Sequence, residues 1–210
     1  MVLLLALTAF AQDAEPWERK VSLAVGPGVG FLVGGNGGGY GVGFAQRVRI
    51  DGALSPVTSL QLDLDHSRHP LRDASGYFEE LAVPADAMEG TRDYVVLDLG
   101  AQVDIDPGPA PTPDRFHVNP LVRFGAGVGF TDTKLDAPSF EGRVELRSRA
   151  VAPLISLGAG VELTVRRWLT FAPAFQFQGL LARDDGEIDH QTQVGVEMRG
   201  QATLDVTLNF

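Results

Sequence analysis

The last segment of the chain, Gln193–Phe210, alternates between apolar and polar positions. From Val194 onward every second residue is apolar or small, and the intervening positions include Glu197, Arg199 and Asp205. A period of two is typical of a β-strand with one apolar and one polar face. The segment is also about twice the usual length of a strand. The pattern therefore predicts a long amphipathic strand at this end of the chain.

Seven earlier segments repeat the alternation, at 20–31, 40–51, 60–65, 95–105, 116–130, 151–165 and 169–181. Connections after the first, third, fifth and seventh are Gly-rich or long and charged, with 67–93 and 131–149 expected to be loops. The other connections are turn-like and mostly short. This sorting is typical of an up-and-down barrel whose short and long loops lie at opposite ends. We therefore expect an all-β fold, a closed antiparallel up-and-down eight-stranded transmembrane β-barrel.

Two features of the strands indicate which face is outside. Glycine is concentrated on the polar face, where small residues suit the crowded interior of a narrow barrel. The apolar face carries no Asp, Glu, Lys or Arg, and a Lys or Arg at the middle of a bilayer costs roughly 2–4 kcal/mol. This favours a membrane barrel over a soluble, lipocalin-type barrel with an apolar interior. Proline lacks a ladder donor, so bulges or strand ends are expected at Pro27, Pro120, Pro153 and Pro173.

Composition narrows the class of protein further. The chain has 210 residues, the length of one domain, and contains no cysteine, which excludes disulfides, thiol nucleophiles and cysteine metal sites. Acidic residues outnumber basic ones by 27 to 17, for a net charge of −10. This charge argues against nucleic acid as a partner. No apolar run approaches the ~20 residues of a transmembrane helix.

The N-terminal residues carry an export pattern. Val2–Phe10 is a short apolar segment, and Ala9, Phe10 and Ala11 have the small-x-small form of a signal peptidase site. We predict a signal peptide at 1–11, a short polar segment at 12–19, and a barrel domain at 20–210.

Charged residues on the polar faces form the best-defined candidate site. An eight-stranded barrel has an interior just wide enough for side chains, and unpaired charges there would be costly. We therefore predict that a salt-bridge network plugs the lumen. Its expected members are Arg47, Arg49, Asp63, Asp65, Asp98, Asp104, Arg123, Glu162, Glu197, Arg199 and Asp205.

The sequence contains one weak candidate for catalysis. Asp65, His66 and Ser67, with His69 nearby, supply the residue types of acyl transfer, as in a lipid acyltransferase at the outer rim. Neighbouring residues on a strand point to opposite faces, however, so His66 and Ser67 should diverge. We expect no enzymatic activity.

The remaining polar signals are weaker. The acidic segment Asp184–Asp189 could bind a divalent cation but lacks the spacing of a calcium loop. His117 is expected in the lumen and His190 in an exposed loop. We therefore predict no metal site and no cofactor.

The pattern as a whole resembles the small bacterial outer-membrane barrels of the OmpA/OmpX type. The resemblance is carried by the export segment, the eight alternating strands, the Gly-rich strand Leu157–Glu162 leading into Arg166 and Arg167, and the terminal aromatic residue. It implies the outer membrane of a Gram-negative bacterium. It also implies that Phe210, with Leu208 and Val206 before it, is the signal read by the barrel assembly machinery. We further expect contact with outer-membrane lipid and lipopolysaccharide, and a monomer.

Three functions are compatible with this sequence. The first is a structural or surface-interaction barrel with no open pore. The second is a narrow conduit or binding barrel for a small apolar molecule, as in OmpW-like barrels, which an apolar upper lumen and a lateral opening at the prolines would favour. The third and most remote is the rim acyltransferase.

Overall fold

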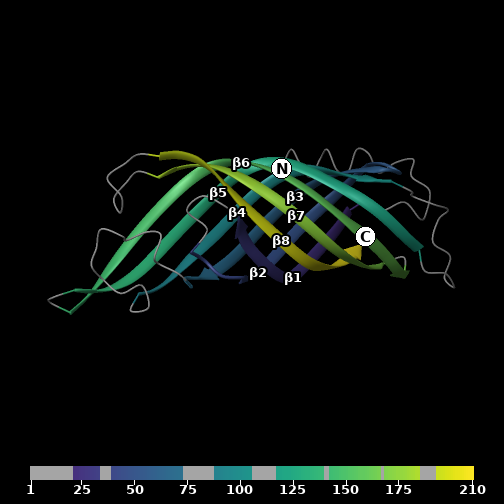
Figure 1. Cartoon of the computed structure of the whole chain (residues 1–210). Coiled ribbons are helices and arrows are strands. Elements are labelled where there is room, and N and C mark those ends of the chain that lie inside the picture. Colours follow the sequence, from purple (N-terminus) through teal and green to yellow (C-terminus); the bar gives the residue numbers. More distant parts are fainter. Residues whose placement is uncertain are drawn as a thin grey trace.

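The computed structural model describes residues 21–33, 39–72, 88–105, 117–139, 142–166, 168–184 and 193–210. These residues form eight strands (Figure 1), which confirms the predicted number. The strands are β1 (Val21–Val33), β2 (Gly43–Ser55), β3 (Thr58–Pro70), β4 (Glu89–Asp104), β5 (His117–Ser139), β6 (Gly142–Arg166), β7 (Leu169–Asp184) and β8 (Gln193–Asn209). The predicted signal peptide and the segment at 12–19 lie outside the described residues.

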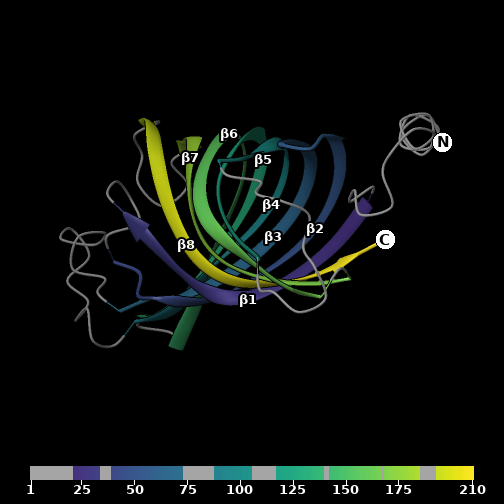
Figure 2. The ribbon, with the colours of Figure 1, turned by 90° about the vertical axis from the view of Figure 1, so that its right-hand side faces the viewer.

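Each strand pairs antiparallel with the next, and the last pairs with the first. Leu23 lies opposite Leu208, and Phe31 lies opposite Gly200, so β1 and β8 run side by side (Figure 2). Where the sheet closes, it removes the free strand edges that would otherwise recruit other chains. The expected closed, antiparallel, up-and-down barrel is confirmed.

The two faces of the strands have opposite polarity. Large apolar side chains point outward, and Leu99, Leu157 and Ile155 are 60%, 61% and 71% exposed. Arg49 and Asp205 point inward and are fully buried. This inversion is expected where lipid surrounds the barrel. Among the described residues, no helix is long and apolar enough to span a membrane.

The prediction of a loop at 131–149 is wrong, because most of this segment is strand. β5 continues to Ser139 and β6 begins at Gly142, with Thr131 opposite Ala150 and Ser139 opposite Gly142. Gly142 has a φ of 131°, a conformation that side-chain-bearing residues rarely adopt. Backbone pairing continues here although the apolar alternation has ended. The resulting hairpin extends beyond the rest of the barrel (Figure 1).

The predicted loop at 67–93 is also shorter than expected. β3 continues to Pro70 and β4 begins at Glu89, with Pro70 opposite Thr91. Residues 73–87 lie outside the described residues. The alternation weakens at both ends of this segment because charged residues occupy outward positions such as Arg68 and Asp93.

The prediction of bulges or strand ends at the prolines is wrong, because the strand register does not shift at any of the four. β1 pairs with β8 in one register on both sides of Pro27, and Pro173 lies opposite Leu204 in an unshifted ladder. Pro120 and Pro153 likewise lie opposite Val161 and Val128. The described register shifts instead fall at the turns, between Ala53 and Ser55 and between Thr164 and Arg166. A proline removes only one donor, and the intact pairs around it hold the strands in place.

One end of the barrel gathers the short turns and the chain end. Only two residues separate β2 from β3, and two separate β6 from β7. Phe210 donates its backbone N–H to Val21 at 2.9 Å, and Asn209 donates to Trp168 at 3.0 Å. Short turns face the periplasm in outer-membrane barrels, so we call this the turn end and the opposite one the outer end.

Candidate functional site in the barrel lumen

The predicted network residues all belong to the inward faces of the strands. Arg47 and Arg49 come from β2, the acidic residues from β3, β4, β6 and β8, Arg123 from β5, and Arg199 from β8. The buried members are Arg47, Arg49, Asp63, Asp65, Asp98, Arg123, Glu162, Glu197, Arg199 and Asp205, while Asp104 is half-buried. The structure therefore brings all of them into the lumen, but in separate contact groups.

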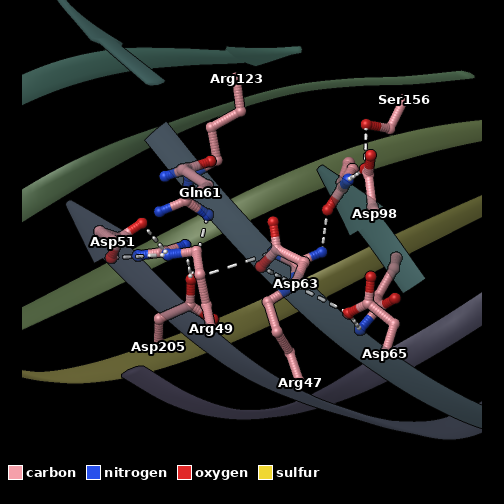
Figure 3. Close-up of polar contacts among 12 residues, drawn as sticks. Arg47, Arg49, Asp51, Gln61, Asp63, Asp65, Asp98, Arg123, Ser156 and Asp205 are labelled. Atoms are coloured by element: carbon pink, nitrogen blue, oxygen red, sulfur yellow. Dashed lines mark hydrogen bonds and ion pairs between the residues drawn. The ribbon is translucent and has the colours of Figure 1, made fainter. Parts of the chain in front are cut away.

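The first group is centred on Asp205 of β8 (Figure 3). Arg49 Nη1 lies 2.8 Å from Asp205 Oδ2, and Arg123 Nη1 lies 3.0 Å from the same oxygen. Arg47 Nη1 is more distant, at 3.9 Å. One carboxylate thus joins guanidinium groups from β2 and β5, strands that are not neighbours in the sheet. Charge-assisted hydrogen bonds of this kind cross-brace the interior.

The second group surrounds Asp65 of β3. Arg47 Nε donates to Asp65 Oδ1 at 2.8 Å and lies 3.7 Å from Asp63. Gln178 donates to the other carboxylate oxygen of Asp65 at 3.0 Å, and Arg47 also contacts Gln176. Strands β2, β3 and β7 are joined here, and Arg47 links this group to the first.

Glutamines, which were not among the predicted members, connect further carboxylates. Gln102 donates to Asp104 at 2.9 Å and to Glu162 at 3.1 Å. Asp98 accepts hydrogen bonds from Ser156 and, at 3.4 Å, from Gln176. The prediction considered only charged residues, whereas an amide can donate and accept at once. The sequence pattern already places these glutamines on the polar faces of the strands, which is the signal that could have identified them as lumen residues.

A third group lies nearer the outer end. Glu197 accepts hydrogen bonds from Arg92, at 2.8 Å, and from Tyr94. The guanidinium of Arg199 lies 5.7 Å from the centre of the Tyr94 ring and donates to Gln201. Arg92 was missed because it lies in the segment at 67–93, which the pattern predicts to be a loop, and Tyr94 because the predicted strand begins at 95. Continuing the alternation backward from Val95 would have placed both on the inward face.

An apolar layer in the lumen was also not predicted. It is formed by Tyr94, Val96, Ala152, Leu154 and Leu180, all between 0% and 3% exposed, with Leu32 packed against it. These residues interrupt the polar face in the outer half of β4 and β7 and in the middle of β6. The lumen therefore holds charged and amide side chains toward the turn end and, nearer the outer end, an apolar layer beside the Glu197 group.

Inward glycines make room for the buried carboxylates. A Cβ atom at Gly26 would overlap the side chain of Asp205, and one at Gly125 would overlap that of Asp98. Both glycines are needed for this close approach. The glycine-rich polar face thus reflects the space requirement of the lumen.

His66 and Ser67 point to opposite faces of β3, as predicted for adjacent residues on a strand. His66 faces outward, 3.3 Å from Gln46 and 3.6 Å from Asp93. Ser67 faces inward, where its hydroxyl lies 3.0 Å from His69 Nε2. His69 Nδ1 lies 3.2 Å from the carbonyl of Gly41, so Nδ1 is the donor and Nε2 accepts the proton of Ser67. Ser67 and His69 are fully buried, which closes this pair off from a substrate.

The other candidate residues contribute little to the site. His117 is a half-buried residue at the start of β5, on the inward side of the strand. His190 and nearly all of Asp184–Asp189 lie outside the described residues. Within the described part of the chain, no cluster of three His, Asp or Glu residues could hold a metal ion.

The three residues predicted as an assembly signal face outward at the turn end. Val206, Leu208 and Phe210 are 36%, 39% and 72% exposed. Their positions continue the apolar exterior to the end of the chain. Recognition of these residues during assembly stays a prediction.

Comparisons with solved structures identify the fold. Neisserial surface protein A has a TM-score of 0.51 and 13% identity, covering 90% of this chain and 97% of that one. The attachment invasion locus protein Ail of Yersinia pestis, in complex with the heparin analogue sucrose octasulfate, has a TM-score of 0.54 and 14% identity, covering 92% and 99%. A major outer membrane protein of Thermus thermophilus has a TM-score of 0.53 and 16% identity, covering 91% and 100%.

No family model and no curated protein matches the sequence. The similarity to the solved structures therefore concerns the arrangement of the strands. In this chain the same arrangement carries a band of exposed apolar side chains around a lumen that is mostly polar. The chain has the fold of the small eight-stranded outer-membrane β-barrels, with the apolar exterior that such a fold presents to lipid.

Proposed function

We propose that this protein is a closed outer-membrane barrel with a structural or surface-interaction role, whose lumen is plugged and passes no solute. The observation that carries the proposal is the filling of the lumen. Arg49, Asp65 and Asp205 are fully buried in the charged part, and Leu154 and Leu180 are 3% and 0% exposed in the apolar part. A layer of paired charges and a layer of apolar side chains thus lie one after the other along the lumen, and both would obstruct a solute.

The hairpin of β5 and β6 supports a surface-interaction role. Pairing between β6 and β7 begins at Leu154, so the part of β6 from Gly142 to Pro153 pairs only with β5 among the described strands. Charged side chains at Arg143, Glu145 and Arg147 are exposed along it. Charged side chains on an unpaired strand edge discourage aggregation. The backbone N–H and C=O groups of this edge of β6 remain available to pair with a strand of a partner protein.

We propose that the barrel is assembled through its last strand and works as a monomer without catalysis. Val206, Leu208 and Phe210 supply an exposed apolar end to β8 that the barrel assembly machinery could bind. The closed sheet leaves no free edge along the membrane-spanning part that would demand a second copy. The burial of Ser67 and His69 argues against an acyltransferase.

Conductance in planar lipid bilayers tests the plugged lumen. Protein that shows a shift between unheated and boiled samples on a gel, and is therefore folded, should give no steady channel openings. A reproducible unitary conductance from this folded fraction would contradict the proposal.

The apolar layer favours a second candidate, a narrow conduit or binding barrel for a small apolar molecule. Tyr94, Val96 and Leu180 would contact such a ligand. The layer is filled by its own side chains, however, and the strands keep their register at Pro27 and Pro173. Saturable uptake of an alkane or aromatic hydrocarbon by vesicles that contain the barrel, absent from empty vesicles, would support this candidate over the first.

A further inference from the structure

The outer surface of β3 to β6 changes from apolar to charged within a single row of residues. Strand pairing aligns outward-facing residues into rows across the four strands, and successive rows are about 7 Å apart. From the middle of the membrane band toward the outer end, the rows are Leu64, Leu97, Val128 and Pro153; then His66, Val95, Phe130 and Val151; then Arg68, Asp93, Asp132 and Arg149. The boundary between lipid tails and head groups should lie between the last two rows.

A cleft of about 570 Å³ spans this boundary on the outside of the barrel. Its apolar wall consists of Val95, Phe130 and Val151. Its polar wall includes Arg68, Lys134 and Arg149, with the shorter Asp93 and Asp132 between them. The cleft is therefore amphipathic in the same direction as a lipid molecule that stands beside the barrel.

The cations of the cleft are available to a ligand. Arg68 Nε lies 3.6 Å from Asp93, and Arg149 Nε lies 3.7 Å from Asp132. Both distances exceed those of good hydrogen bonds. The arginine side chains are 58% and 66% exposed. Within the described part of the chain, Lys134 forms no ion pair.

The local charge is opposite to that of the whole protein. The chain carries a net charge of −10, yet basic residues outnumber acidic ones in this cleft. Arg147, in the next row beside Lys134, adds a further positive charge although it is paired with Asp132. An acidic protein that places cations where lipid head groups lie has a surface suited to an anion in that layer.

We propose that this cleft binds a phosphorylated, multiply acylated lipid of the outer leaflet. The phosphate contacts Arg68, Lys134 and Arg149, and acyl chains lie along Phe130 and Val151. Guanidinium and ammonium groups are the usual protein partners of phosphate, and the apolar wall removes acyl surface from water. The inference rests on the outer-membrane placement proposed above, which makes the outer end the outer leaflet.

Binding of defined lipids to the folded barrel tests this site. Bisphosphorylated lipid A and the same lipid after enzymatic dephosphorylation are titrated separately against the protein in micelles of an uncharged detergent, with lipid-bound species measured by native mass spectrometry. The wild type should bind the phosphorylated lipid about tenfold more tightly or better, because each basic residue near a phosphate contributes on the order of 1 kcal/mol. The double variant Arg68→Gln, Arg149→Gln should lose this preference.

A matched control separates the cleft from general charge. The double variant Arg143→Gln, Arg166→Gln removes the same charge from exposed positions near the hairpin tip and at the turn end, and should keep the full preference. Equal binding of both lipids by the wild type would overturn the proposal, as would an equal loss in both double variants. Displacement of lipid A by inorganic phosphate at comparable concentration would also overturn it, in favour of a free anion.

A gel shift between unheated and boiled samples keeps this test independent of the proposed function. A folded, membrane-embedded barrel that shows no preference for phosphate refutes only the lipid site. Protein that never enters the membrane as a heat-modifiable barrel refutes the outer-membrane placement, and with it both proposals.

Discussion

Two ion pairs of the same chemistry occupy opposite sides of the barrel wall. Arg49 and Asp205 meet in the lumen at 2.8 Å, and both side chains are fully buried. Arg149 and Asp132 meet outside at 3.7 Å, with side chains that are 66% and 29% exposed. Losing one inner partner would leave a buried charge with fewer counterions and no water, since Arg49 would keep Asp51 at 2.9 Å and Asp205 would keep Arg123 at 3.0 Å. Water solvates the outer pair. The environment therefore decides that the inner pair braces the fold while the outer pair remains available to a ligand.

The largest effect is expected from breaking the inner pair. Asp205→Asn removes the carboxylate that holds Arg49 and Arg123, and should lower the free energy of unfolding by about 3–5 kcal/mol. Urea unfolding in phosphatidylcholine vesicles measures this change. The exposed Asp136, changed to Asn, is the control and should shift the midpoint little. Similar small shifts for both variants would show that the lumen pairs are not structural.

Placing an unpaired charge on the lipid-facing side should have the next largest effect. Leu99, 60% exposed near the middle of the outward face of β4, faces the bilayer, so Leu99→Arg should destabilise the barrel by about 2–4 kcal/mol. Ile105→Arg, at the turn end and 64% exposed, should cost about 0–1 kcal/mol. The same vesicle assay compares the two variants. Equal losses would mean that the apolar band does not lie in lipid as described.

Breaking the outer pair should change stability least among the substitutions. Arg149→Gln removes one partner of a solvated pair and should alter the free energy of unfolding by less than about 1 kcal/mol. Urea unfolding with the wild type in parallel gives the difference. A loss as large as that of Asp205→Asn would remove the distinction between the two sides of the wall.

A pH titration of Asp132 addresses the outer side alone. Asp132 lies beyond the apolar band, where the hydrogen bond from Arg147 lowers the pKa of its carboxyl group below the ordinary value. Its contribution is present above the unfolded-state pKa and disappears as pH falls through the lower folded-state value. NMR of the Asp132 side-chain carboxyl carbon should therefore show a titration midpoint below the ordinary aspartate value of about 3.9. Titration at the ordinary value, or unchanged titration in Arg147→Gln, would contradict the contact.

The sequence determined the number of strands, the polarity of the two faces and the identity of most charged lumen residues. This was possible because a period of two is a local property, and one face without charge indicates lipid. The same method failed where the outward face becomes charged. The ends of β3, β4, β5 and β6 are paired strands whose alternation no longer separates apolar from polar residues.

Only the tertiary structure decided which lumen groups meet. Asp205 joins Arg49 and Arg123 because the register and tilt of the closed sheet bring β2, β5 and β8 to one level, and no local pattern contains that information. The layer around Leu154 and Leu180, and the outer cleft between Phe130 and Arg149, arise in the same way. Alternation along each strand assigns a side chain to a face, whereas closure of the barrel selects its neighbours.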